Sequence, residues 1–100
     1  MTTVSLGETR DEYVIEAEGH ATGSPEVCAA ISMMLNTAAN WTMAKGYEGE
    51  QLLEEGHARV VIPRGIRGAK TVFNLVSVGI DSLEKNYGDF VKKGKKLGQD

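Results

Sequence analysis

The sequence predicts an α+β fold, a two-layer sandwich in which two helices pack on one face of a mostly antiparallel sheet. Two long segments repeat apolar residues at three- and four-residue spacing, and each follows two short segments in which polar and apolar residues alternate. Glycine and proline separate these segments. The expected element order is therefore β-β-α-β-β-α. The sheet face away from the helices is expected either to be solvated or to pair with another subunit.

The first two strands are expected within residues 3–6 and 13–18, joined by the polar hairpin connection 7–12. Alternate residues of the second strand form an apolar face. Val14 falls among the charged residues of the opposite face, so that face is not wholly polar. The strand is expected to stop at Gly19.

The first helix is expected to start at Ser24 and Pro25 and to run to about residue 45, where Gly46 stops it. A serine side chain can accept a bond from the unpaired N–H groups of a first turn, and proline suits the first helical position. Glu26 places a negative charge at the positive end of the helix dipole.

Two further strands, 50–54 and 57–62, flank Glu55-Gly56, a two-residue hairpin signal in which glycine supplies the positive φ. Pro63 is expected to end the second of these strands. The second helix is expected over residues 69–86, where apolar residues again recur at helical spacing.

A last short extended piece is expected at residues 89–91, because Phe90 needs burial. The basic segment 92–100 follows as a polar tail that is expected to fray. One hundred residues suit a single domain, which we place at residues 1–91.

The totals exclude several classes of function. A formal net charge of −3 gives no reason to expect direct binding to nucleic acid. No apolar run approaches the ~20 residues of a membrane span, and the N-terminus lacks the basic start and apolar core of a secretory signal. Cys28 is the single cysteine, so it forms no internal disulfide and a reducing cytoplasm is the expected location.

Cys28 is the first candidate for chemistry. It lies four residues past Ser24, so its sulfur is expected over the first helical turn. The helix dipole contributes only ~0.3–1 kcal/mol there, which is less than one pKa unit at ~1.36 kcal/mol. A neighbouring histidinium is the stronger activator of a thiol. The simpler alternative is that Cys28 is a small buried apolar residue.

His20 is the candidate partner, because it follows Gly19 at the expected strand end and four residues lead from it to the helix. Eight residues of separation permit contact with Cys28. A nucleophile and a base are the minimum set for acyl transfer, and N–H groups at the helix start could hold an oxyanion. The alternative is a histidine that simply faces solvent.

Three other residues carry weaker expectations. Ser32 lies one turn beyond Cys28 and either bonds the sulfur or the imidazole or bonds its own backbone. Glu26 either orients His20 or only complements the dipole. His57 follows a turn and is expected to be solvated. Because no cysteine or histidine pairs stand at zinc spacing, neither a metal site nor a cofactor is expected.

The segments Gly19-His20-Ala21 and Val27-Cys28-Ala29-Ala30-Ile31-Ser32 together resemble the motifs of the ribosomal-processing cysteine protease family Prp. In that family, Gly-His-Ala is followed by a loop and then by Val-Cys-Ala-x-x-Ser. The resemblance extends over nearly the whole chain, and residues 84–91 resemble the family's ending. It implies a compact α+β homodimer that removes an N-terminal extension from a large-subunit ribosomal protein.

By this resemblance, Cys28 is the nucleophile, His20 the base and acid, and Ser32 a supporting residue, while Gly19 allows a tight approach at the strand end. The chain departs from the family in two places. Its loop between His20 and Cys28 is shorter, and Pro25 stands where members usually carry an aspartate. Such divergent relatives also occur in phage genomes, so the substrate implied is a ribosomal protein precursor or a related phage protein.

A second hypothesis is a non-catalytic homodimeric module for binding or assembly in ribosome biogenesis. The small residues and methionines of the first helix would then serve an interface, and Cys28 would only pack. The two hypotheses differ on Cys28→Ala, which abolishes the function of a protease and leaves that of a binding module intact.

Overall fold

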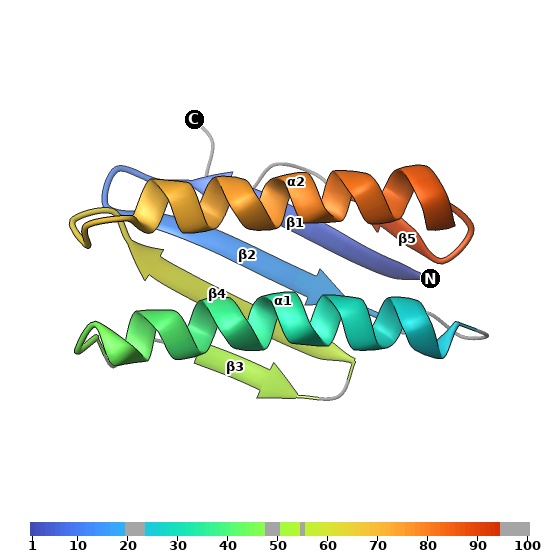
Figure 1. The fold of residues 1–100 in the computed structure, drawn as a ribbon, viewed down its shortest axis with the longest axis horizontal. Coiled ribbons are helices and arrows are strands. Elements are labelled where there is room, and N and C mark those ends of the chain that lie inside the picture. The colour runs from blue at the N-terminus through green and yellow to red at the C-terminus, as the bar shows by residue number, and fades with distance from the viewer. Residues whose placement is uncertain (20–23, 48–50, 55, 95–100) are drawn as a thin grey trace.

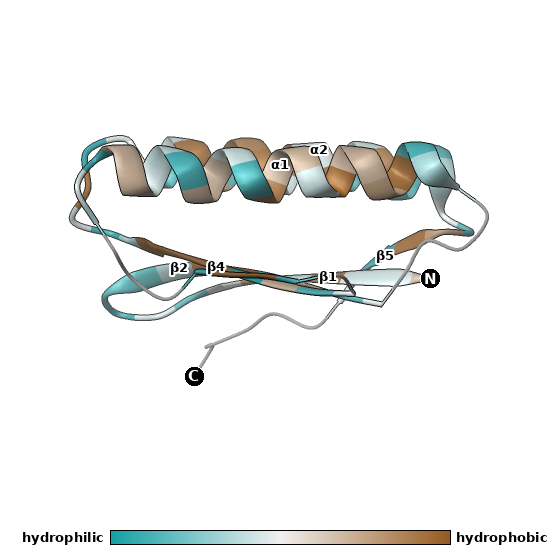
Figure 2. Cartoon of the chain, turned by 90° about the horizontal axis from the view of Figure 1, so that it is seen from below, coloured by the Kyte–Doolittle hydropathy of each residue, from teal (hydrophilic) through white to brown (hydrophobic). Residues whose placement is uncertain are grey.

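The computed structural model describes residues 1–19, 24–47, 51–54 and 56–94. These residues form a five-stranded sheet with two long helices over one of its faces (Figure 1). The edge-on view in Figure 2 shows the two layers, with both helices on the same side of the sheet. The α+β class and the predicted order of elements are confirmed. The extended piece expected at residues 89–91 is a short fifth strand that begins only at Val91, because residues 89 and 90 form a turn after the second helix.

The elements lie close to the predicted ranges. They are β1 Thr2–Glu8, β2 Glu12–Glu18, α1 Pro25–Ala44, β3 Gln51–Glu54, β4 His57–Pro63, α2 Ala69–Tyr87 and β5 Val91–Lys93. The first hairpin is tighter than the sequence suggested, because Gly7, Glu8 and Glu12 belong to its strands. Pro63 is the last residue of β4, a position where its missing N–H is tolerated. Residues 50 and 55, also expected in the second hairpin, lie outside the described residues.

The strands lie in the order β3-β4-β2-β1-β5. Neighbours are antiparallel except β1 and β5, which are parallel, with Thr2 opposite Val91 and Val4 opposite Lys93. The strand therefore extends two residues into the segment expected as a tail. Lys93 is held there because its Nζ donates to Asp81 Oδ1 at 2.8 Å on α2. The rest of that segment, from residue 95, lies outside the described residues.

The hydrophobic core fills the space between the sheet and the helices. Its largest fully buried side chains include Ile15, Leu35, Ile62 and Ile80, one from each of the four long central elements that meet there. Full burial of such a side chain contributes about 1.5–3 kcal/mol. This core fixes which face of each strand and helix points inward, and so which side chains line the space between the two layers.

The other sheet face carries charged side chains, such as Glu16 and Arg59, and also an apolar pair. Val14 and Val61 are cross-strand partners on this face, and they are only 4% and 3% exposed. The prediction that Val14 lies apart from the apolar face of its strand is confirmed, since it does not belong to the core between the layers. Neither described helix has an apolar stretch long enough to cross a membrane.

Candidate active site

The start of α1 is built around Ser24, the predicted cap. The Ser24 Oγ accepts a hydrogen bond from the Val27 N–H at 3.4 Å, and the Ser24 carbonyl accepts one from the Cys28 N–H at 3.3 Å. The Ser24 hydroxyl in turn donates to Glu26 Oε2 at 3.1 Å. The cap prediction is confirmed, and the Glu26 carboxylate is bonded to the cap.

This arrangement narrows the choice of oxyanion donors at the helix start. Pro25 has no N–H, and the N–H groups of Val27 and Cys28 already donate to Ser24. The Glu26 N–H is therefore the first-turn donor that Ser24 does not use. We expected the N–H groups of the helix start to hold the oxyanion. In this turn, the N–H group that Ser24 leaves for that role is that of Glu26.

Cys28 is half-buried, one turn into α1, and it packs against the hydrophobic core. Its thiol forms no disulfide. The side chain also lines a cleft of about 440 Å³ that runs between α1 and the sheet. We call this space the Cys28 cleft. Half-burial beside a cleft is a position in which a thiol can be reached by a peptide, whereas a wholly buried cysteine is inert.

The helix wall of the Cys28 cleft consists of Cys28, Ile31, Ser32, Leu35 and Asn36. Ser32 is exposed and shares this wall with Cys28, as its helical spacing predicted. Its carbonyl accepts a 2.7 Å bond from the Asn36 side chain, which keeps the Asn36 amide against the helix. The structure thus brings Ser32 and Cys28 to one wall of the same cleft.

The opposite wall comes from the sheet and could not be read from the sequence. It includes Ala17, Gly19, Leu53, Gly56 and Ala58. Leu53 and Ala58 are cross-strand partners, so both point toward α1, and Leu53 is 41% exposed. An apolar side chain left half-open over a cleft offers a binding surface for an apolar group.

Gly19 closes the end of β2 under tight packing. Its φ is +91°, and a Cβ at this position would lie 2.5 Å from the Met1 carbonyl oxygen. Its N–H donates to the Gly56 carbonyl at 2.9 Å, which joins the end of β2 to the turn before β4. Only glycine fits both the backbone angle and the space. This packing fixes the position of the residue that directly precedes His20.

His20 itself lies outside the described residues, as do residues 21–23. The described residues that precede and follow this segment both lie at the site. Gly19 lines the Cys28 cleft, and Ser24 caps the helix that carries Cys28. Contact between His20 and Cys28 stays a prediction, and so does any contact between His20 and Glu26.

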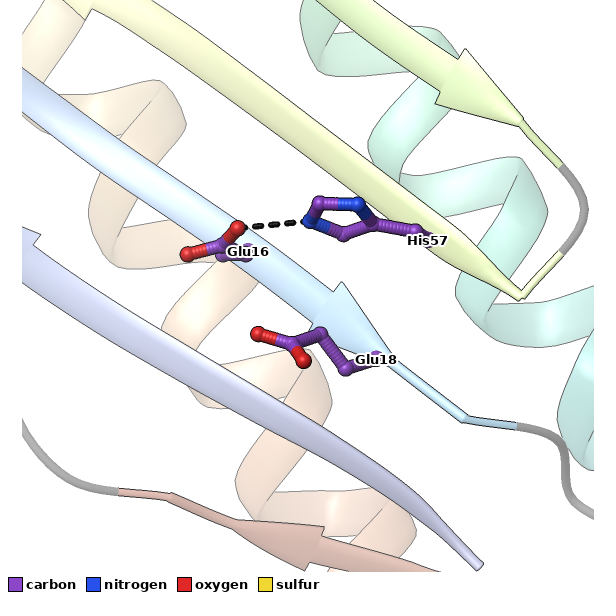
Figure 3. A group of neighbouring side chains, drawn as sticks. All are labelled: Glu16, Glu18 and His57. Atoms are coloured by element: carbon purple, nitrogen blue, oxygen red, sulfur yellow. Dashed lines mark hydrogen bonds and ion pairs between the residues drawn. The ribbon is translucent and has the colours of Figure 1, made fainter.

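The second histidine, expected to be solvated, is partly exposed and is also hydrogen-bonded. His57 lies on the sheet face away from the helices, beside Glu16 and Glu18 (Figure 3). Its Nε2 lies 2.7 Å from Glu16 Oε2, and its side chain is 43% exposed. The hydrogen bond to Glu16 raises the pKa of His57 above 6.5; desolvation opposes the rise, and the negative charges of Glu16, Glu18 and Glu54 add to it. The β2–β4 register, unknown from sequence, creates this pair.

Comparison with known proteins places the chain in a family. The family model described as cysteine protease Prp matches residues 1–92. No curated protein sequence matches the chain. A solved structure of similar fold is the essential ribosomal processing protease Prp from S. aureus, in complex with a covalently linked product peptide. It is 18% identical, with a TM-score of 0.76, and the match covers 96% of this chain and 100% of that one. The chain belongs to the Prp family of cysteine proteases.

Proposed function

We propose that the chain is a cysteine endopeptidase in which Cys28 is the nucleophile and His20 is the general base and acid. The observation that carries this proposal is the place of Cys28, one turn past a capped helix start and on the wall of a cleft of about 440 Å³. Family membership supports the reaction type. The substrate proposed is the N-terminal extension of a ribosomal protein precursor, or a related phage protein.

The chemistry follows from the roles of the two groups. His20 takes the thiol proton as Cys28 Sγ attacks the scissile carbonyl, and the protonated imidazole then gives that proton to the leaving amine. The acyl group is then held on Cys28 as a thioester. A water molecule, deprotonated by the same imidazole, hydrolyses this thioester, which releases the N-terminal product as a carboxylic acid, and the imidazolium returns its proton to the Cys28 sulfur. The Glu26 N–H lies at the helix start, where a developing oxyanion is stabilised.

The test is cleavage of the host's ribosomal protein precursor by the full chain. We expect wild type to remove the N-terminal segment, and Cys28→Ala and His20→Ala each to lower kcat/KM by at least about 10³-fold, since a dyad acts as a unit. Asn36→Ala, on the same cleft wall, is the matched control and should lose much less. Full activity in Cys28→Ala would reject the protease and favour a binding module.

Alkylation separates the dyad from the choice of substrate. Cys28 should react with iodoacetamide well below pH 8, faster than an unperturbed thiol whose pKa is about 8.5, and His20→Ala should slow the reaction. A thiol that titrates near 8.5 in the wild type, with no effect of His20→Ala, would remove His20 from the mechanism even if the natural substrate were still unknown.

We further propose that the chain acts as a homodimer through the outer surface of its helical layer. Residues 28–44 and 71–80 contain no Asp, Glu, Lys or Arg, although such residues make up 25% of the chain. Met33, Leu75 and Val78 on these segments are 68%, 71% and 61% exposed. An exposed apolar surface without charge is typical of a subunit contact, and a second copy presents a surface of the same kind.

A further inference from the structure

The helix-free face of the sheet carries a second cluster of reactive side chains, of which His57 also contributes to the lining of the Cys28 cleft. Glu16, Glu18 and His57 each offer one ligand atom, and these atoms all lie within 4.8 Å of one another (Figure 3). The strand register brings these three side chains together. Glu18 is the cross-strand partner of His57, and Glu16 lies two residues earlier on the same strand, so all three point to one face.

We propose that Glu16, Glu18 and His57 form a site for a divalent transition-metal ion of the zinc type. The strands that hold it are rigid, because β2 and β4 pair without a break from Glu12–Pro63 to Glu18–His57. The hydrogen bond from the Gly19 N–H to the Gly56 carbonyl continues this pairing beyond the cluster. The site is therefore preorganised in its backbone and needs only side-chain movement to close.

The donor set selects the class of ion. One imidazole nitrogen and two carboxylates suit zinc and its neighbours, whereas calcium and magnesium prefer oxygen alone. Ligand atoms of a tetrahedral zinc site lie roughly 3.3 Å apart. The His57 and Glu16 atoms, 2.7 Å apart, must separate slightly, and Glu18 must swing inward, which its exposed side chain permits. A water molecule completes the fourth position.

The surrounding charge favours a cation. Glu54 on β3 is the cross-strand partner of His57 from the other side, and it is one of the carboxylates whose charge acts on the imidazole. Three carboxylates thus surround one imidazole. The one cation described beside them is Arg59, whose Nη1 lies 3.5 Å from Glu16 Oε1. These side chains together carry more negative than positive charge, and a bound divalent ion neutralises the excess.

The sequence-spacing rules that predicted no metal site cannot detect this cluster. Those rules find ligands close together in the sequence, whereas Glu16 and His57 are 41 residues apart and meet only through strand pairing. The inference does not rest on the proposed protease mechanism, because none of the three ligands belongs to the proposed dyad.

The experiment is a calorimetric titration of the full chain with Zn²⁺ alone. It is done in a Cys28→Ser background, because a thiol and His20 could also bind zinc. We expect one ion per chain, with His57→Asn and Glu18→Gln each weakening binding by at least about tenfold. Glu12→Gln, which removes the same charge from the far end of the same strand face, should change affinity less than twofold.

Two readouts make the result decisive. Zn²⁺ should raise the Tm of the Cys28→Ser chain, and His57→Asn should remove that rise even if it alters the starting Tm. Co²⁺ bound to the Cys28→Ser chain should give a d–d absorption spectrum that His57→Asn removes. Loss of binding in Cys28→Ser, or an unchanged affinity or Co²⁺ spectrum in His57→Asn, would each overturn the site.

Discussion

Gly19 shows how one residue without a side chain shapes the site. Its left-handed backbone lets the chain after β2 lie where an added Cβ would clash with the Met1 carbonyl, and its own carbonyl accepts a hydrogen bond from the Thr2 hydroxyl. The same residue joins β2 to the turn before β4 through Gly56. The position from which His20 leaves the sheet is therefore set by packing that a larger residue cannot reproduce.

Gly19→Ala should lower the free energy of unfolding by more than about 2 kcal/mol, because it combines an unfavourable φ, costing about 1–2 kcal/mol, with a steric clash. Urea unfolding measures the loss. Gly46→Ala isolates the backbone cost, since its φ is +89° and nothing lies within 4 Å of the added Cβ. A loss at Gly19 no larger than that at Gly46 would show that the Met1 contact does not matter.

His57 gives the fold a pH dependence of predictable sign. Its pKa is raised in the folded state above 6.5, so the protonated form is favoured by folding. The resulting stability is fully present below the unfolded pKa of about 6.5 and is lost as the pH rises through the folded pKa. The stability difference between wild type and His57→Asn should therefore shrink from about pH 6 to pH 8.

Denaturant titrations at several pH values, with a chelator present, measure this difference. Glu16→Gln should remove most of the same dependence, because its hydrogen bond is the main cause of the raised pKa. A His57→Asn chain whose stability follows the wild type in parallel across this range would contradict the assignment.

At the scale of elements, α1 is the part that links local sequence to the site. Ser24 is 3% exposed and caps the turn that carries Cys28, so its hydroxyl positions the start of the helix as well as stabilising it. Ser24→Ala should lower the free energy of unfolding by about 0.5–2 kcal/mol. Thermal or urea unfolding checks this value, with the exposed Ser82→Ala on α2 as a near-neutral control.

Ser24→Ala should lower the reactivity of Cys28 by more than the loss of folded protein explains. If the cap positions Cys28, Ser24→Ala should slow iodoacetamide alkylation at a temperature where the chain is fully folded. An unchanged alkylation rate would limit the role of Ser24 to stability.

The sequence predicted the elements well because each has a local cause. The Ser24-Pro25 start, the alternation in β2 and the glycine after α1 act within a few residues. The cleft was not predictable in the same way. Ala17 and Ala58 meet in its wall because β2 pairs with β4 in one register, and that register depends on contacts across the sheet. The Glu16–His57 pair was missed for the same reason.

At the scale of the whole molecule, the uncharged outer surface of the helices predicts self-association. Leu75→Glu places a charge at its most exposed apolar position and should shift the chain from dimer to monomer by at least about tenfold in Kd. Analytical ultracentrifugation measures this shift. Lys70→Glu, exposed on the same helix outside the charge-free stretch, is the control. A wild-type chain that is monomeric at all concentrations would reject the dimer.

The parallel pairing of β1 with β5 constrains when the molecule can be completed during synthesis. β1 can form its hairpin with β2 almost at once, but its other edge receives Val91–Lys93 only after both helices and the second hairpin have been made. Until then, that edge presents unpaired backbone groups next to Thr2, a residue that also lines the Cys28 cleft. A nascent copy thus carries its cysteine long before the strand beside the cleft is secured, and maturation of this fold ends with its last strand.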